Sequence, residues 1–193
     1  MALRETETYN LETSSYYTET SLPRGMLGYA ISKRESTNIF YFTGGTGGGF
    51  KKDVYSYNPE SKLFTELQSK MLTPRAYHGS HVYEVGTVAK LVVVGGITTE
   101  WGKTYTVEMC DISSSSGTWT YGQPLPNTDA WRYLTMDDAI HGYQNGATVI
   151  YKYEQRTDEW IQRYIQDENS GFSMMSGAIA LNIKDVQQYC PLI

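Results

Sequence analysis

Short apolar runs, separated by polar and turn-forming residues, recur along the whole chain. Two of them, within residues 38–43 and 90–94, consist of β-branched and aromatic residues and end in the glycine pairs Gly44-Gly45 and Gly95-Gly96. Runs of this length and composition predict strands buried on both faces. Glycine adopts positive φ without steric cost, so each pair predicts a sharp turn directly after its strand.

A second kind of segment alternates apolar and polar residues and predicts half-exposed strands at 52–58, 105–111 and 147–154. Each is followed by a polar stretch suited to a turn, since short polar side chains can bond their own backbone there. An aromatic residue stands after each turn, and we expect it to pack across the sheet onto the next unit. These aromatic residues are Phe64, Trp119 and Trp160.

The same order of segments returns after about 50 residues, which is typical of a repeat architecture. Its clearest mark is a tyrosine-type residue followed at a short distance by an aromatic one. The pairs are Tyr9/Tyr16, Tyr57/Phe64, Cys110/Trp119 and Tyr153/Trp160, the third with a longer gap.

Two units, at 24–70 and 75–124, match each other well in the order and spacing of their segments. A third, at 131–166, is degraded: its first strand is expected at 133–141, and 142–146 stands where the strand with paired glycines should be. This unit therefore has either three strands or an atypical second strand.

The two ends of the chain hold complementary partial units. Residues 5–22 supply the last two segments of a unit, and residues 171–183 supply a first segment. Pairing between them would close a ring and protect the sheet edges, giving about four repeated sheets in a single domain over 1–193. The alternative is a fragment of a larger, six-unit ring with open edges.

Composition agrees with an all-β class, since tyrosine occurs 17 times and proline six times. The net charge of -5 excludes the basic field that nucleic-acid binding requires. The N-terminal residues lack the apolar core of a signal peptide, and no apolar run is long enough to span a bilayer. We therefore expect a cytoplasmic monomer without membrane contact, or an extracellular protein if the N-terminus is truncated.

The motif order resembles the kelch repeat over residues 23–126 and does so in part elsewhere. Phe64 in place of tryptophan, Cys110 in place of tyrosine and the missing glycine pair of the third unit depart from the motif. The residues that fill its positions are Arg24, Gly44, Gly45, Tyr57 and Phe64 in one unit and Arg75, Gly95, Gly96 and Trp119 in the next.

The resemblance implies a kelch-type β-propeller of about four blades, one degenerate and one split between the termini. It also implies a non-enzymatic module that binds another protein. The alternative is an extracellular propeller enzyme or carbohydrate-binding protein resembling galactose oxidase.

The loops after the glycine pairs and the segments between units should gather at one end of the sheets, where binding residues concentrate. Trp101 could instead fold onto its own blade, and the arginines could hydrogen-bond backbone carbonyls between blades. The residues expected to bind the partner are Arg24, Phe50, Lys51, Arg75, Trp101, Lys103 and Arg132.

The sequence gives little support for phosphate binding, metal binding or catalysis. The glycine-rich stretch 44–49 lacks the lysine and the helix of a phosphate-binding loop. His78 and His81 should point to opposite faces of a strand, which disfavours a shared metal, and of Asp137 and Asp138 one at most should face the central channel. Cys110 is expected to be a buried thiol. We thus expect no cofactor, no metal and no catalytic site.

Overall fold

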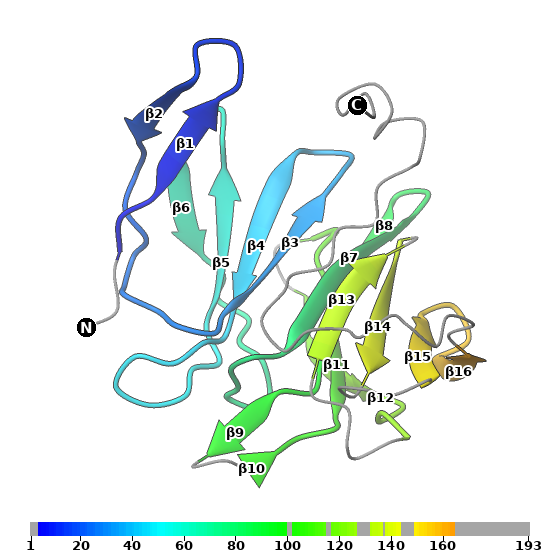
Figure 1. Cartoon of the computed structure of the whole chain (residues 1–193). Helices are drawn as coiled ribbons and strands as arrows, with labels where there is room; N and C mark the ends of the chain where they lie inside the picture. The colour runs from blue at the N-terminus through cyan, green and yellow to red at the C-terminus, as the bar shows by residue number, and fades with distance from the viewer. Residues whose placement is uncertain are drawn as a thin grey trace, which may run out of the picture.

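The computed structural model describes residues 4–99, 102–114, 117–126, 132–136, 138–143 and 149–164. Within these ranges the chain forms β-strands, turns and connections, with no helix, so the all-β prediction is confirmed. The strands make three four-stranded antiparallel sheets, one separate hairpin and one short ribbon (Figure 1).

Each large sheet is an antiparallel meander whose strands pair in the order in which they occur along the chain. The first sheet contains β3 (Ala30–Arg34), β4 (Ile39–Thr43), β5 (Val54–Asn58) and β6 (Leu63–Glu66). The second contains β7 (Gly79–Val85), β8 (Val88–Val94), β11 (Val107–Asp111) and β12 (Trp119–Gly122). The third contains β13 (Arg132–Met136), β14 (Ala139–Tyr143), β15 (Val149–Glu154) and β16 (Glu159–Tyr164).

The third sheet corrects one sequence expectation. The single strand expected at 133–141 is a hairpin, β13 and β14, whose turn includes Asp138 at a φ of 57°. Aspartate tolerates this left-handed conformation better than most residues, so a tight turn forms where the pattern reads as one strand. The sheet therefore has four strands, and the second one is atypical because no glycine pair follows it.

The apolar core lies between the sheets. Along β8, Leu91 and Val93 belong to the cluster shared with the first sheet, while Val92 and Val94 belong to the cluster shared with the third. All four side chains are 0% exposed. The prediction that this run is buried on both faces is confirmed, because successive residues of a strand point to opposite sides.

The two motif tryptophans join their sheets to the preceding one, not to the next one as expected, whereas the Phe64 ring contacts Phe42 and Tyr57 of its own sheet. The indole of Trp119 donates a hydrogen bond to the Ser69 carbonyl at 3.4 Å, and that of Trp160 donates to the Gln123 carbonyl at 3.0 Å. Ser69 and Gln123 both follow the outer strand of the preceding sheet. The repeat thus carries its own contact with the previous sheet.

The N-terminal hairpin, β1 (Glu7–Asn10) and β2 (Ser15–Thr18), stands apart as a two-stranded sheet. The centroids of its Tyr9 and Tyr16 rings lie 4.8 Å apart with the ring planes tilted by 47°, and the two side chains remain 45% and 71% exposed. Residues 171–183, expected to pair with this hairpin, lie outside the described residues. Within the described ranges the sheets do not close into a ring.

Candidate functional site at the glycine end

One end of the sheets gathers the long connections, and we call it the glycine end (Figure 1). It comprises the loop 44–53 after β4, the connection 95–106 after β8 and the inter-sheet segments 19–29 and 67–78. Backbone bonds join these parts: the Arg75 amide donates to the Lys51 carbonyl at 2.9 Å, and the Gly45 amide to the Arg75 carbonyl at 2.8 Å. The expectation that these segments meet at one end is confirmed.

The two loops differ in form. In the first, Gly48 and Gly49 take φ values of 72° and 105°, and a Cβ on either would meet open space. This loop leads into strand β5 rather than into a helix. In the second, the chain extends into a ribbon of β9 (Ile97–Thr99) and β10 (Gly102–Lys103).

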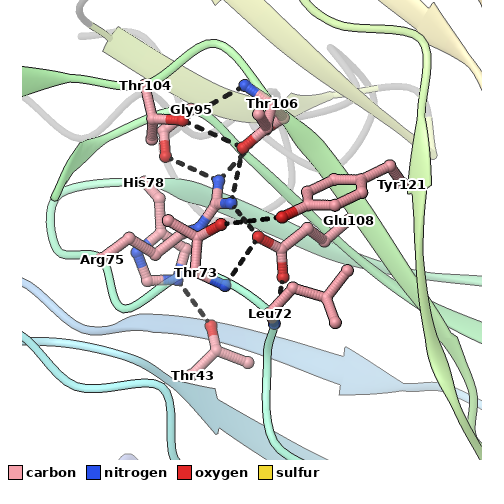
Figure 2. A network of polar contacts seen from close by, with 10 residues as sticks. All are labelled: Thr43, Leu72, Thr73, Arg75, His78, Gly95, Thr104, Thr106, Glu108 and Tyr121. Carbon is pink, nitrogen blue, oxygen red and sulfur yellow. Dashed lines mark hydrogen bonds and ion pairs between the residues drawn. The ribbon is translucent and has the colours of Figure 1, made fainter.

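Beneath the loops lies a buried ion pair between Arg75 and Glu108, both side chains being 0% exposed (Figure 2). The Arg75 guanidinium also donates to the Gly95 carbonyl at 2.9 Å and to the Thr106 carbonyl and hydroxyl at 3.1 and 2.7 Å. Charged groups removed from water need such partners, and both terminal nitrogens of the guanidinium have them, whereas the buried Nε has none among the described residues. Arg75 therefore holds the ends of β8 and β11 together.

Glu108 extends this network to the inter-sheet segment. Its carboxylate accepts the backbone amides of Leu72 at 2.7 Å and Thr73 at 3.0 Å. The Arg75 side chain presents no surface to a partner, which corrects its expected binding role. It fits the alternative in which the repeat arginine bonds carbonyls, although these carbonyls belong to its own sheet.

Arg24, the repeat counterpart of Arg75, sits in a more open environment. Its guanidinium donates to the Tyr55 hydroxyl at 2.8 Å and to Asp53, which also accepts from the Lys70 ammonium at 2.9 Å. Partial burial alone would raise the pKa of Asp53, but Lys70 and Arg24 outweigh it and lower that pKa. The Arg24 side chain is 31% exposed, so it retains some surface toward solvent.

His78, just before β7, and His81, within β7, point in opposite directions, as expected. His78 lies 2.8 Å from the Thr43 hydroxyl of the first sheet, and His81 lies 3.0 Å from the Asp138 carboxylate of the third. Burial, with a smaller effect of the Arg75 charge, lowers the pKa of His78 to about 3, so the ring is neutral. The described residues hold no cluster of three potential metal ligands.

The remaining expected binding residues are placed as follows. Phe50 and Lys51 are half-buried in the glycine loop, with the Lys51 ammonium 3.4 Å from the Gly48 carbonyl. Lys103 is half-buried in β10. Arg132 begins β13, so it does not occupy the inter-sheet position of Arg24 and Arg75. Trp101 lies outside the described residues.

Sequence reasoning missed two exposed apolar residues at this end, Leu27 and Tyr77. Their side chains are 53% and 55% exposed. Both lie in inter-sheet segments, where no apolar periodicity marks them. No sequence signal identifies either residue. What distinguishes Tyr77 is its positive φ, which is a property of the folded backbone.

A scan against protein-family models and a search of curated proteins found no match to this chain. In the described part of the chain, no helix is both long and apolar enough to cross a lipid bilayer.

Proposed function

We propose that this chain is a kelch-type propeller protein that acts as a non-enzymatic binding module for another protein. The kelch motif positions and the three similar four-stranded meanders support the propeller arrangement. In this proposal the N-terminal hairpin and residues 171–183 form the fourth blade.

The observation that carries the binding role is the convergence of two long connections on the glycine end. Backbone bonds and the Arg75–Glu108 network tie this end to the sheets. Loops on such a scaffold can present side chains to a partner at little cost in conformational entropy. The surface comprises Phe50, Lys51 and Lys103, with Arg24 at its side; Trp101 and Arg132 remain proposed members.

Site-specific photo-cross-linking tests the proposal. A photoreactive amino acid replaces Phe50 in one variant of the full chain. In the control it replaces Leu63, which is 61% exposed at the start of β6, at the end of the sheet opposite the glycine end. Both variants are exposed to extract from the native cell. A discrete protein adduct formed from position 50 and absent from position 63 is expected.

Equal labelling from both positions, or a discrete adduct from position 63 alone, would contradict the proposed surface. Formation of a defined product from a small molecule by the purified chain would contradict the non-enzymatic role.

A further inference from the structure

Tyr77 has an unusual backbone conformation for its place in the fold, with a φ of 56°. Among the described residues, five other non-glycine residues have positive φ, and each lies in the turn of a β-hairpin. Tyr77 instead lies in the connection between the first and second sheets. The five turn residues are Ser14, Asn38, Lys62, Asp138 and Asp158.

The equivalent position in the first sheet is a glycine. Leu27 and Thr46 exchange two backbone bonds, at 2.9 and 2.8 Å, and Ala76 and Ile97 exchange two at 3.0 and 2.9 Å. Gly28 directly follows Leu27 and has a φ of 61°, just as Tyr77 directly follows Ala76. The fold therefore requires a left-handed residue here, and tyrosine fills that position with strain that glycine avoids.

Burial does not explain this tyrosine, because its side chain is 55% exposed. Its ring lies beside Gly28, where an added Cβ would come within 2.9 Å of it. A strained residue retained at an exposed position is a reason to infer a function for its side chain.

The surroundings of Tyr77 combine apolar and cationic groups. Leu27 is exposed beside Gly28, and Thr46, the bridge partner of Leu27, also bridges to Phe50. Lys51 and Lys52 follow Phe50, and neither forms a salt bridge with a described residue, whereas Arg24 and Arg75 are neutralised by carboxylates.

The opposite end of the sheets carries charges of both signs. Exposed carboxylates stand in or beside its hairpin turns at Glu60, Asp111 and Glu159, together with the exposed cations Lys62 and Arg156. The two uncompensated lysines of the glycine end are thus set apart from these acidic groups within a chain of net charge -5. Complementary charge on a partner would steer it to the lysine-bearing end.

We propose that Tyr77 is the central recognition residue of a patch formed by Leu27, Phe50, Lys51, Lys52 and Tyr77. The partner is a protein segment in which carboxylates flank an apolar side chain. The apolar side chain packs on the Tyr77 ring, and the carboxylates meet the two lysines. This inference rests on the proposed binding function and names its recognition chemistry.

The test is a selection from a displayed random peptide library on the purified full chain, followed by resynthesis of the recovered peptides. Binding of these peptides is then measured by fluorescence anisotropy to wild type, Y77G, Y77F, K51Q/K52Q and N38G. Y77G suits the test because glycine accepts the left-handed backbone, and N38G makes the same kind of change in a distant hairpin turn.

Peptides rich in Asp and Glu around an apolar residue are expected. Y77G should weaken their binding about tenfold or more, which is the scale of a central interface residue. Y77F and N38G should leave it near the wild-type value, and K51Q/K52Q should weaken it and reduce its salt dependence.

Three results would overturn the inference. Peptides that bind Y77G as well as wild type would refute the role of Tyr77, and peptides that lack acidic residues would refute the proposed partner chemistry. Either result leaves the binding module intact if substitution of Phe50 or Lys103 abolishes peptide binding. Failure to recover any peptide with a folded chain, while a known peptide-binding domain succeeds in parallel, would count against the proposed function as well.

Discussion

The Arg75 guanidinium and the Glu108 carboxylate form an ion pair from which water is excluded, and the pair joins the second sheet to the segment that enters it. Removing one partner leaves a buried charge uncompensated, so we expect R75M to lower the free energy of unfolding by about 3–5 kcal/mol. R24M, at a partly exposed pair, should cost about 1 kcal/mol or less. Urea denaturation of both variants measures the difference, and equal losses would contradict the structural role of Arg75.

The indole N–H groups of Trp119 and Trp160 make equivalent bonds to the preceding sheet. We expect W119F and W160F each to lower stability by about 1–3 kcal/mol, from the lost hydrogen bond and the reduced ring volume. The sites belong to different sheet interfaces, so the double variant should show nearly the sum. Y121F, at an exposed ring of β12, serves as the control and should change stability little in the same denaturation series.

His78 should make stability depend on pH. Its pKa is about 3 in the folded chain, below its ordinary value of 6.5, so the unfolded chain binds the proton first as pH falls. The contribution of His78 to the free energy of unfolding is therefore fully present above pH 6.5. It declines as pH falls toward 3, by at most about 1.4 kcal/mol per pH unit.

The variant H78Q, which can still bond Thr43, should show a shallower decline over that window. Burial also lowers the pKa of His81 against the opposing effect of Asp138, so part of the slope should remain in H78Q. Urea midpoints recorded between pH 7 and 4 test this, and an unchanged slope would show that His78 does not contribute.

Tyr77 should carry a stability cost that glycine removes. The left-handed conformation costs a non-glycine residue about 1–2 kcal/mol, which substitution by glycine recovers. Glycine gives back about 0.4–1 kcal/mol of that gain because it has more conformational freedom in the unfolded chain. We expect Y77G to match wild-type stability or exceed it by up to about 1.6 kcal/mol, and Y77A to show no gain. Thermal and urea denaturation together check the sign; a clear loss in Y77G would mean that the ring stabilises the fold.

If the proposed propeller closes, β1 should be protected in the full chain. If residues 177–181 pair with the segment 6–11, the amides of β1 that do not bond β2 should exchange slowly with solvent. Hydrogen exchange followed by NMR reads this residue by residue, with the exposed turn 11–14 as an internal reference. Fast exchange at every outward amide of β1 would favour the open fragment.

The repeat itself was readable from sequence because each of its marks has a local cause. The spaced pairs Tyr57/Phe64, Cys110/Trp119 and Tyr153/Trp160 are directly opposed residues of antiparallel hairpins, and so are Tyr9 and Tyr16. Their spacing is set by strand and turn length, which are local properties. The β13–β14 turn was missed because Asp138 lies between polar and apolar residues that read equally well as one strand.

The candidate site was only partly predictable. Loops that follow paired glycines could be assigned to one end of the sheets, since strand alternation fixes which end a connection occupies. The sequence assigned the same role to Arg24 and Arg75, because both fill the same motif position. Their different environments depend on Glu108 in β11 and on Asp53 just before β5, which the fold brings to them from 33 and 29 residues away.

By itself the sequence determined the β-class, the repeated strands and turns of the first two sheets, and the burial of β8 on both faces, because these follow from local periodicity and turn chemistry. Tertiary structure decided which motif arginine is buried, which sheet each tryptophan contacts and where the backbone forces Tyr77 into a left-handed conformation. Those properties arise from contacts between segments far apart in the chain, and no local pattern encodes the environment that a neighbouring sheet creates.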